Sequence, residues 1–265
     1  MEVHHHPKVE NLPAGKAGKK FKEYFLEFIM IFLAVTMGFF AETIRENITE
    51  HRRAREFAES MLQDLREDTI QLKSYRDYFD FAASATDTLQ QLLANAEPAK
   101  IPSGKLYWYG LFGGAHRYFV PNDQTFQQMK SSGSLRYFTR KVASAVARYD
   151  RFCRLIQSNE LMDANLYAEV RKLRAQLFDF KYNDMANTIF QTRWTGFDHS
   201  RLDSFMRSNP PLLSNNKALF NQYVELVRSR FLRRSMVAYA DSTLKQANLL
   251  IVELKKEYHL KDGEE

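Results

Sequence analysis

The sequence predicts an all-α protein in which a single N-terminal transmembrane helix continues into an extramembrane bundle of three long helices joined by short ones. Three observations predict this fold class. Residues 28–41 contain no charged side chain. Neither glycine nor proline occurs in residues 43–97, 134–195 or 212–262. Within these three stretches apolar side chains recur at alternating steps of three and four, the spacing of a buried helix face.

The overall composition is that of a folded chain and excludes several protein classes. Of the 265 residues, 45% are apolar and 26% are charged, which excludes wholesale disorder. The single cysteine excludes an internal disulfide framework and a cysteine-rich zinc site. The net charge of +6 permits binding to phosphates or anionic lipid headgroups without requiring it. No motif indicates a cofactor or a metal, and none is predicted.

Residues 1–20 are expected to form a disordered tail, because Pro7, Pro13, Gly15 and Gly18 interrupt them. Such a tail precedes the most apolar part of the chain. The tail carries four lysines, and a fifth, Lys22, follows it directly.

Residues 21–43 are predicted to span the membrane as a helix. The charge-free run Phe28–Ala41 has 14 residues, and extension to Tyr24 and Thr43 gives the length of roughly 20 residues that a bilayer needs. A cleaved signal peptide is one alternative, but Phe39 and Phe40 stand where its cleavage site needs small residues. A buried helix of a soluble domain is the other alternative, and it fits poorly beside a lysine-rich tail.

Residues 44–265 are predicted to form the helical extramembrane domain. The membrane helix is expected to run directly into the first bundle helix, because no helix-breaking residue follows Ala41 before Pro98. This first helix has the apolar spacing of a coiled coil. Its expected buried stripe is Leu72, Tyr75, Phe79, Ala82, Thr86, Leu89 and Leu93.

The remaining helices follow from breakers and caps. Residues 134–195 are predicted to be one long helix or two, with Ser158-Asn159 as the expected interruption. The last helix is expected to begin after Ser214-Asn215-Asn216, which offer N-caps. Short helices are predicted after Asp123, ending at Gly133, and after Asp198, ending before Pro210.

The connection at residues 98–133 is an aromatic loop and the most unusual stretch of the chain. Its two aromatic runs surround Gly113-Gly114, so they predict either a small β-hairpin or irregular chain that caps the bundle. As a ligand or partner surface it would combine stacking with hydrogen bonding. The alternative is that the same side chains close the end of the bundle. The candidate surface residues are Tyr107, Trp108, Tyr109, His116, Arg117 and Tyr118.

Three segments carry a resemblance to a known family. The opening MEVHHHPKVE, the block FKEYFLEFIMIFLAVTMGFFAETIREN and the run DQTFQQMKSSGSLRYF resemble a family of uncharacterised single-span membrane proteins of Bacteroidota. The resemblance covers roughly the first 140 residues well and the remainder loosely. It implies a bacterial envelope protein with a helical domain, and it implies no catalytic residue or cofactor.

Enzyme chemistry finds little support in the sequence. His51, His116, His199 and His259 are scattered without metal-ligand spacing, and no nucleophile motif occurs. The acids Asp64, Glu67 and Asp68 are expected to be charged helix positions rather than an acid–base pair. Cys153 is expected to be a small core residue, because it lies within an apolar stripe. An undetected enzyme stays as the second alternative to the function proposed from the sequence.

An arginine cluster on the last helix invites a nucleic-acid interpretation. Arg228, Arg230, Arg233 and Arg234 could contact phosphates, or could pair with acids on neighbouring helices. No recognition motif accompanies them, so nucleic-acid binding is not predicted.

The sequence therefore predicts a membrane-anchored, non-enzymatic envelope scaffold or partner subunit. The first alternative is a small-molecule sensing module that uses the aromatic loop. The predicted location is the bacterial inner membrane, with the domain in the periplasm, partly because the family resemblance implies it. The expected partners are the lipid bilayer and either another membrane protein or a second copy of the chain.

The membrane helix itself has a candidate packing face. Glu27, Ala34 and Gly38 fall on one side, and Ala34 with Gly38 forms a small-xxx-small pair that lets another helix approach closely. Glu27 would need a partner there, or would reach the interface instead.

Overall fold

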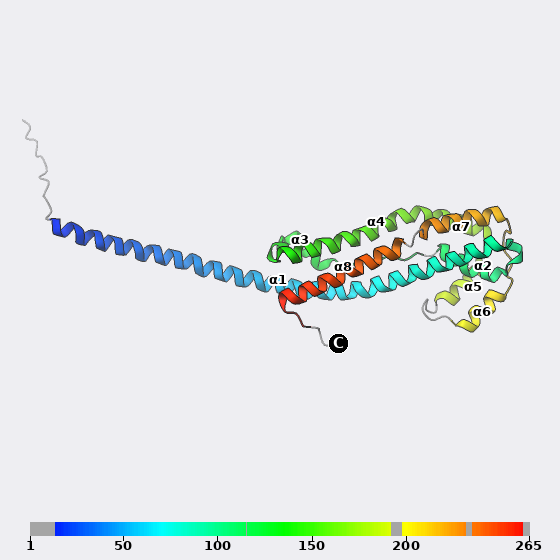
Figure 1. The fold of residues 1–265 in the computed structure, drawn as a ribbon, viewed down its shortest axis with the longest axis horizontal. Helices are drawn as coiled ribbons and strands as arrows, with labels where there is room; N and C mark the ends of the chain where they lie inside the picture. Colours follow the sequence, from blue (N-terminus) through cyan, green and yellow to red (C-terminus); the bar gives the residue numbers. More distant parts are fainter. Residues whose placement is uncertain (1–13, 115, 192–197, 232–234, 262–265) are drawn as a thin grey trace, which may run out of the picture. The chain divides into compact units, whose positions relative to one another are not determined.

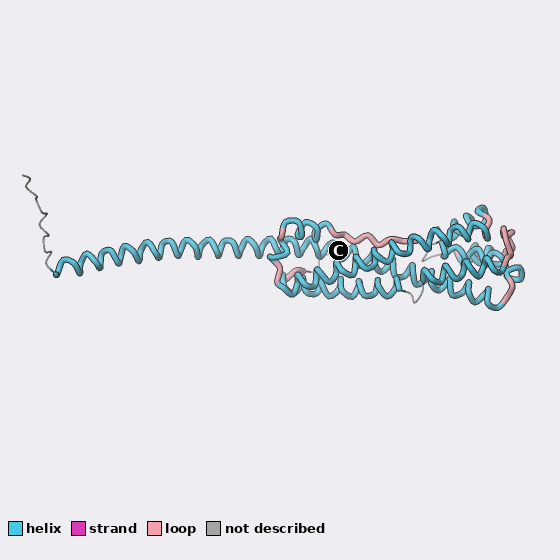
Figure 2. Tube along the Cα trace, turned by 90° about the horizontal axis from the view of Figure 1, so that it is seen from above, coloured by secondary structure: helices cyan, strands magenta, loops and turns pink. Residues whose placement is uncertain are grey.

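The computed structural model describes residues 14–114, 116–191, 198–231 and 235–261. The chain divides into two compact units, residues 1–55 and 56–265. Within the described ranges every regular element is helical, and Figure 2 accordingly shows cyan helices joined by pink loops. The only β-type pairing there is an isolated bridge between Phe178 and Leu212. The prediction of an all-α chain is confirmed.

Eight α-helices and three short 3-10 helices make up the described chain (Figure 1). The α-helices are α1 (Ala14–Asn95), α2 (Ser103–Leu111), α3 (Gln124–Ser132), α4 (Arg140–Leu177), α5 (Phe180–Gln191), α6 (His199–Arg207), α7 (Lys217–Phe231) and α8 (Ser235–Tyr258). The 3-10 helices are η1 (Pro98–Lys100), η2 (Phe112–Gly114) and η3 (Ser134–Tyr137).

In the first unit, helix α1 begins at Ala14, which corrects part of the expected disordered tail. Residues 14–20 are helical because alanine and lysine are strong helix formers, and two glycines cost only about 1 kcal/mol each against alanine. Residues 1–13 lie outside the described residues. An 18-residue window of this helix has a mean hydropathy of 2.0 and no buried residue. By length and composition, it is a candidate membrane span.

In the second unit, residues 56–95 of α1 lie beside α4 and α8 (Figures 1 and 2). Polar contacts fix this arrangement: Tyr149 of α4 donates to Asp68 of α1, and Tyr75 of α1 donates to Met236 of α8. The expected stripe is buried along its whole length and extends upstream at steps of three and four. Its buried members are Ala58, Met61, Leu65, Asp68, Leu72, Tyr75, Phe79, Ala82, Thr86, Leu89 and Leu93.

Helix α4 packs against both α7 and α8, and it differs from the expected helix in length. It passes through Ser158-Asn159 without a break, and the Asn159 side-chain amide donates to the Leu155 carbonyl one turn earlier. The break lies instead at Phe178, whose backbone is extended. There the Leu213 N–H donates to the Leu177 carbonyl, a tertiary contact that the sequence pattern does not reveal.

The third long helix is two helices, α7 and α8, with residues 232–234 between them outside the described residues. Its start agrees with the expectation, because the Asn216 side chain accepts from the Ala218 and Leu219 N–H groups. The two short helices also lie where the sequence predicts. Helix α3 ends at Gly133, whose φ of 69° is left-handed, and Asp198 caps α6 by accepting from the Arg201 N–H.

The first aromatic run is neither a hairpin nor irregular chain, because residues 103–111 form helix α2. The second run lies in residues 116–123, which form no regular element, so irregular chain is correct for that part. Helix α2 packs against α5 and α6, and this packing overrides the strand preference of its aromatic side chains. Gly104 lets α2 approach α6 closely: a Cβ there would collide with the Phe205 carbonyl oxygen, and the Gly104 N–H donates to the Ser208 carbonyl.

Candidate functional site

The six residues of the candidate surface are divided between the core and the surface. Tyr107 and Trp108 are buried in α2, and Tyr109 is half-buried. The Tyr107 hydroxyl donates to the Pro211 carbonyl at 2.7 Å and accepts from the Asp179 N–H at 2.9 Å. These contacts attach α2 to the start of α5 and to the segment after α6. Tyr107 therefore serves packing at this end of the bundle.

The residues after η2 lie against α1 and α4 instead. Arg117 donates to the Ser74 hydroxyl at 2.9 Å, and its guanidinium lies 5.6 Å from the centre of the Tyr78 ring. Tyr118 is exposed, and its ring meets the edge of His116 at 4.1 Å between centroids. His116 alone of the six candidates reaches a polar network inside the bundle.

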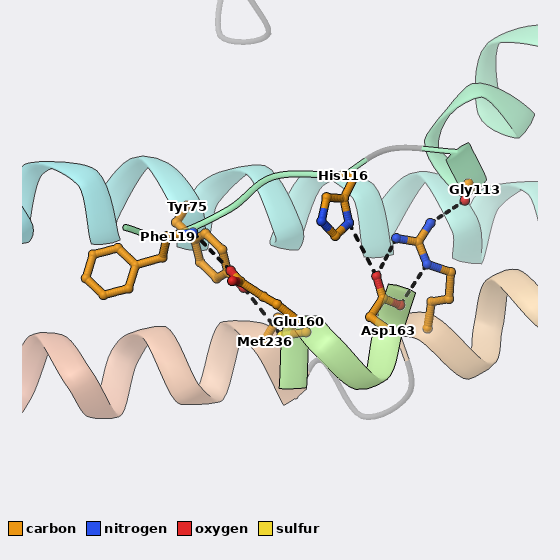
Figure 3. A network of polar contacts seen from close by, with 8 residues as sticks. Tyr75, Gly113, His116, Phe119, Glu160, Asp163 and Met236 are labelled. Atoms are coloured by element: carbon orange, nitrogen blue, oxygen red, sulfur yellow. Dashed lines mark hydrogen bonds and ion pairs between the residues drawn. The ribbon is translucent and has the colours of Figure 1, made fainter. Parts of the chain in front are cut away.

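That network is centred on the buried ion pair Asp163–Arg230 (Figure 3). The Arg230 Nε donates to Asp163 Oδ1 at 2.8 Å, and its Nη2 donates to Oδ2 at 2.6 Å. The Arg230 Nη1 donates to the Gly113 carbonyl, which fixes η2 against α7. The Arg230 guanidinium also lies 5.0 Å from the centre of the Tyr167 ring. This arginine of the predicted cluster pairs with an acid inside the protein, whereas Arg233 and Arg234 lie outside the described residues.

The electrostatics of Asp163 reflect two opposing effects. Burial by itself raises the pKa of this carboxyl. The hydrogen bonds from Arg230, together with the proximity of His116, outweigh burial and lower the pKa below 3.8. The His116 Nδ1 lies 3.6 Å from Asp163 Oδ2, beyond hydrogen-bond distance. Asp163 is therefore held ionised by its partners.

A second buried acid lies one turn away on α4 (Figure 3). The Glu160 carboxylate accepts from the Phe119 N–H at 2.9 Å, which holds the extended segment after His116 against the bundle. Burial raises the pKa of Glu160, and the Phe119 N–H partly opposes that rise. Tyr75 lies beside it and donates to the Met236 sulfur at 3.4 Å.

A third buried acid, Asp68, corrects the expectation that it is an ordinary charged helix position. Its two oxygens accept from the Tyr149 hydroxyl at 2.6 Å and from the Asn122 N–H at 2.8 Å. Burial raises the pKa of Asp68, and these two donors oppose the rise. Cys153 is buried nearby, as predicted, and burial raises the pKa of its thiol to about 12, so it stays protonated.

A cavity of about 590 Å³ lies next to the Asp163–Arg230 pair, between α1, α4, α5 and the η2 segment. His116 lies on its wall together with four residues of α4, namely Tyr167, Arg171, Arg174 and Ala175. Its volume is within the range of small-molecule sites. Of the six candidate surface residues, only His116 lines it.

Two side chains on the cavity wall hold buried polar atoms without a hydrogen-bond partner. They are both ring nitrogens of His116 and the Nε of Arg174. Burying a donor without an acceptor costs roughly 1–3 kcal/mol, so such atoms are uncommon in folded proteins. They give this cavity a capacity for hydrogen bonding that the protein does not use.

Glu160, Asp163 and Arg174 are not among the candidate residues predicted from the sequence, but the sequence holds a signal for them. The core-facing positions of α4 after Ile156 follow at alternating steps of four and three, and at these positions apolar side chains give way to polar ones. The positions are Ile156, Glu160, Asp163, Tyr167, Val170, Arg174 and Leu177. Charged residues at core positions are costly unless they are paired, so their spacing predicts a polar interior.

Comparisons with family models, curated proteins and solved structures found no match to this chain. Among the described residues, no group of three or more histidine, cysteine or acidic side chains is arranged to hold a metal ion. In the first unit, Glu27, Ala34 and Gly38 are exposed, and a Cβ added to Gly38 would meet nothing within 4 Å.

Proposed function

We propose that this chain is a single-pass protein of the bacterial inner membrane, with its helical domain in the periplasm. In this proposal it is a member of the single-span Bacteroidota family that its sequence resembles. It acts without catalysis, as an envelope scaffold or as a subunit of another membrane protein. Its immediate partners are the lipid bilayer and a second transmembrane helix.

The observation that carries the proposal is the exposure of large apolar side chains on all sides of α1 between Phe21 and Ile48. Phe28, Phe32 and Phe39 are each more than half exposed. A helix that is apolar on every side is stable either inside a protein core or across a membrane. Since 20 helical residues reach about 30 Å, this segment matches the hydrocarbon thickness of a bilayer.

The state of the buried ionisable groups supports a non-enzymatic role. Asp163 forms an ion pair with Arg230, and Asp68 accepts a hydrogen bond from the Tyr149 hydroxyl. The Cys153 thiol is protonated. A general base takes a proton from substrate and a cysteine nucleophile must be ionised, whereas these carboxylates already accept hydrogen bonds from protein donors and the thiol is protonated.

The specific observation in favour of a ligand-sensing role is the cavity beside His116.

Alkaline carbonate washing tests the membrane anchor. The full chain should stay in the membrane pellet, because an inserted helix is not released when peripheral contacts are broken. A double variant, Leu33→Arg with Val35→Arg, should be recovered in the supernatant, since each central arginine opposes insertion by about 3 kcal/mol.

A matched control distinguishes membrane insertion from nonspecific hydrophobic adsorption to the pellet. Ile70→Arg with Val120→Arg changes two exposed apolar side chains outside the segment, and this variant should remain in the pellet. Release of the unmodified chain into the supernatant would contradict the proposal.

Site-directed cross-linking in intact membranes tests the helix partner. Gly38→Ile should reduce cross-linking to the partner helix, because a branched side chain prevents close approach at the small-xxx-small face of Ala34 and Gly38. Val35→Ile on a neighbouring face is the control and should leave the yield unchanged. Equal yields for the two variants would refute this packing face.

A further inference from the structure

The cavity beside His116 is lined by both apolar and cationic side chains. The apolar lining includes Leu111, Phe112, Phe178 and Phe190. Arg171 and Arg174 supply two guanidinium groups, and among the described residues Asp184 is the only acid on the lining. The described lining therefore carries an excess of positive charge together with apolar surface.

The two arginines differ from Arg230 in how they are paired. Arg230 meets Asp163 through two hydrogen bonds. Arg174 donates instead to the neutral Asn183 amide oxygen at 2.5 Å, and its Nε has no acceptor. Arg171 lies 5.7 Å from the centre of the Tyr167 ring. Throughout the part of the chain that the structure describes, no carboxylate lies within ion-pair distance of Arg171 or Arg174.

The guanidinium of the half-buried Arg174, whose Nε is fully buried, keeps its charge. Burial lowers the pKa of Arg174 from 12.5, but an arginine in a protein stays protonated at neutral pH. A buried cation without an anionic partner is unfavourable. Gly114 contributes to its placement, since a Cβ there would collide with the guanidinium. A bound oxyanion would satisfy both the charge and the unused Nε–H donor.

His116 extends the same donor set to the inner end of the cavity. Neither ring nitrogen has a hydrogen-bond partner, although Asp163 lies 3.6 Å from Nδ1. Arg171, by contrast, is exposed at the rim. The cavity lining thus combines an exposed cation, a half-buried cation, an imidazole and aromatic side chains.

We propose that this cavity binds a small soluble organic anion in which one carboxylate or phosphate group is attached to a compact apolar body. The oxyanion pairs with Arg174 and Arg171, and the apolar body packs on Phe112 and Phe178. This binding role goes beyond the scaffold function and does not depend on the membrane anchor.

Isothermal titration calorimetry of the full chain in phosphatidylcholine nanodiscs tests the proposal, with empty nanodiscs as the blank. The probes are 4-phenylbutyrate, phenyl phosphate and the neutral 4-phenylbutyramide. At least one of the two anions should bind, and the amide should bind about tenfold more weakly or worse, because it lacks the charge-assisted hydrogen bonds. Comparison of the two anions identifies the preferred oxyanion group.

Three variants locate the binding. Arg174→Gln and Arg171→Gln should each weaken the preferred anion by about tenfold. Arg148→Gln removes an exposed arginine on α4 outside the cavity lining and should leave the affinity unchanged. Far-ultraviolet circular dichroism checks each fold. If the Arg174→Gln variant unfolds, the affinity of the Arg171→Gln variant, whose substituted residue is exposed, is compared alone with that of the unmodified chain.

Three results would overturn the proposal. The first is no heat above the blank for either anion up to about 10 mM, a concentration at which even a weak site is occupied. The second is equal affinity for the anions and the amide. The third is unchanged affinity in every folded cavity variant.

Discussion

At the scale of single residues, the pair Asp163–Arg230 is the contact whose loss should cost the most stability. Both side chains are more than nine-tenths buried. Asp163→Asn would leave the Arg230 cation buried without its anion, so the free energy of unfolding should fall by roughly 3–5 kcal/mol. Chemical denaturation in detergent, followed by circular dichroism, measures the change.

The matched control for this variant is Asp150→Asn, the same change on the same helix. Asp150 pairs with Arg154 four residues on, at the surface. Exposed pairs of this kind contribute less than about 1 kcal/mol, so the control should be nearly neutral. Similar losses for the two variants would mean that the buried pair has no special role in stability.

Asp68 should give the bundle a distinct pH dependence. Its pKa is raised above 3.8 in the folded state, so its contribution to stability is fully present below pH 3.8 and is lost as pH rises through the folded pKa. Asp68→Asn stays neutral and escapes this loss. Relative to the unmodified chain, the variant should therefore gain melting temperature as pH rises from 3.8 toward 7.

Gln71→Asn is the control for the pH experiment. Gln71 lies one turn after Asp68 on α1, is exposed and carries no titratable group, so its substitution should shift the melting temperature equally across the range. If the difference between Asp68→Asn and the unmodified chain did not vary with pH, the raised pKa of Asp68 would be wrong.

At the scale of elements, the helices that could be predicted are those whose signals are local. Seven stripe positions on α1, the capping of α6 by Asp198 and the end of α3 at Gly133 all follow from spacing or from turn residues. The start of α1 at Ala14 differs from the expected disordered tail, because Gly15 and Gly18 are tolerated inside this helix. The all-α class needed no tertiary information.

The features that could not be predicted depend on contacts between distant segments. The end of α4 at Leu177 is fixed by a hydrogen bond to Leu213, and α2 is helical because it packs on α5 and α6. The cavity brings together His116 and Arg174, which are 58 residues apart in the chain. Spacing along a single helix shows that Arg174 faces inward, but it does not show what lies opposite.

The turn after α3 offers a prediction at this scale. Gly133 has a φ of 69°, and a Cβ there would meet nothing within 4 Å, so backbone conformation alone favours glycine. Gly133→Ala should lower the free energy of unfolding by about 1 kcal/mol. Gly133→Asn should cost less, because asparagine adopts left-handed backbone more readily than alanine. Equal costs in denaturant titrations would point to a cause other than φ.

At the scale of the whole molecule, the two units follow opposite rules of side-chain placement. In the first unit large apolar side chains are exposed, as in Phe28 and Phe39. In the second unit most large apolar side chains are buried, although some such as Ile70 and Phe180 are exposed, and the buried acids Asp68 and Asp163 each have partners. The second unit therefore has a buried apolar core, whereas the apolar surface of the first unit is the kind that the proposed membrane span requires.

For the proposed membrane span, the lysines and arginines on either side of the apolar segment predict an orientation. Five lysines precede it, at positions 8, 16, 19, 20 and 22, and four arginines follow it, at 45, 52, 53 and 55. Positive charge is retained in the cytoplasm, so a small excess favours the tail inside and the domain in the periplasm. An alkaline phosphatase fused after Glu265 should be active, and green fluorescent protein fused there should be dark.

Because the charge difference is small, orientation should respond to substitution on either side. Replacing Lys16, Lys19, Lys20 and Lys22 with glutamine leaves one lysine against four arginines, so fluorescence of the fusion should rise and phosphatase activity should fall. Replacing Arg52, Arg53 and Arg55 with glutamine should have the opposite effect and strengthen the periplasmic signal. If the unmodified fusion is fluorescent and the lysine substitutions change nothing, the domain lies in the cytoplasm and the charge argument is wrong.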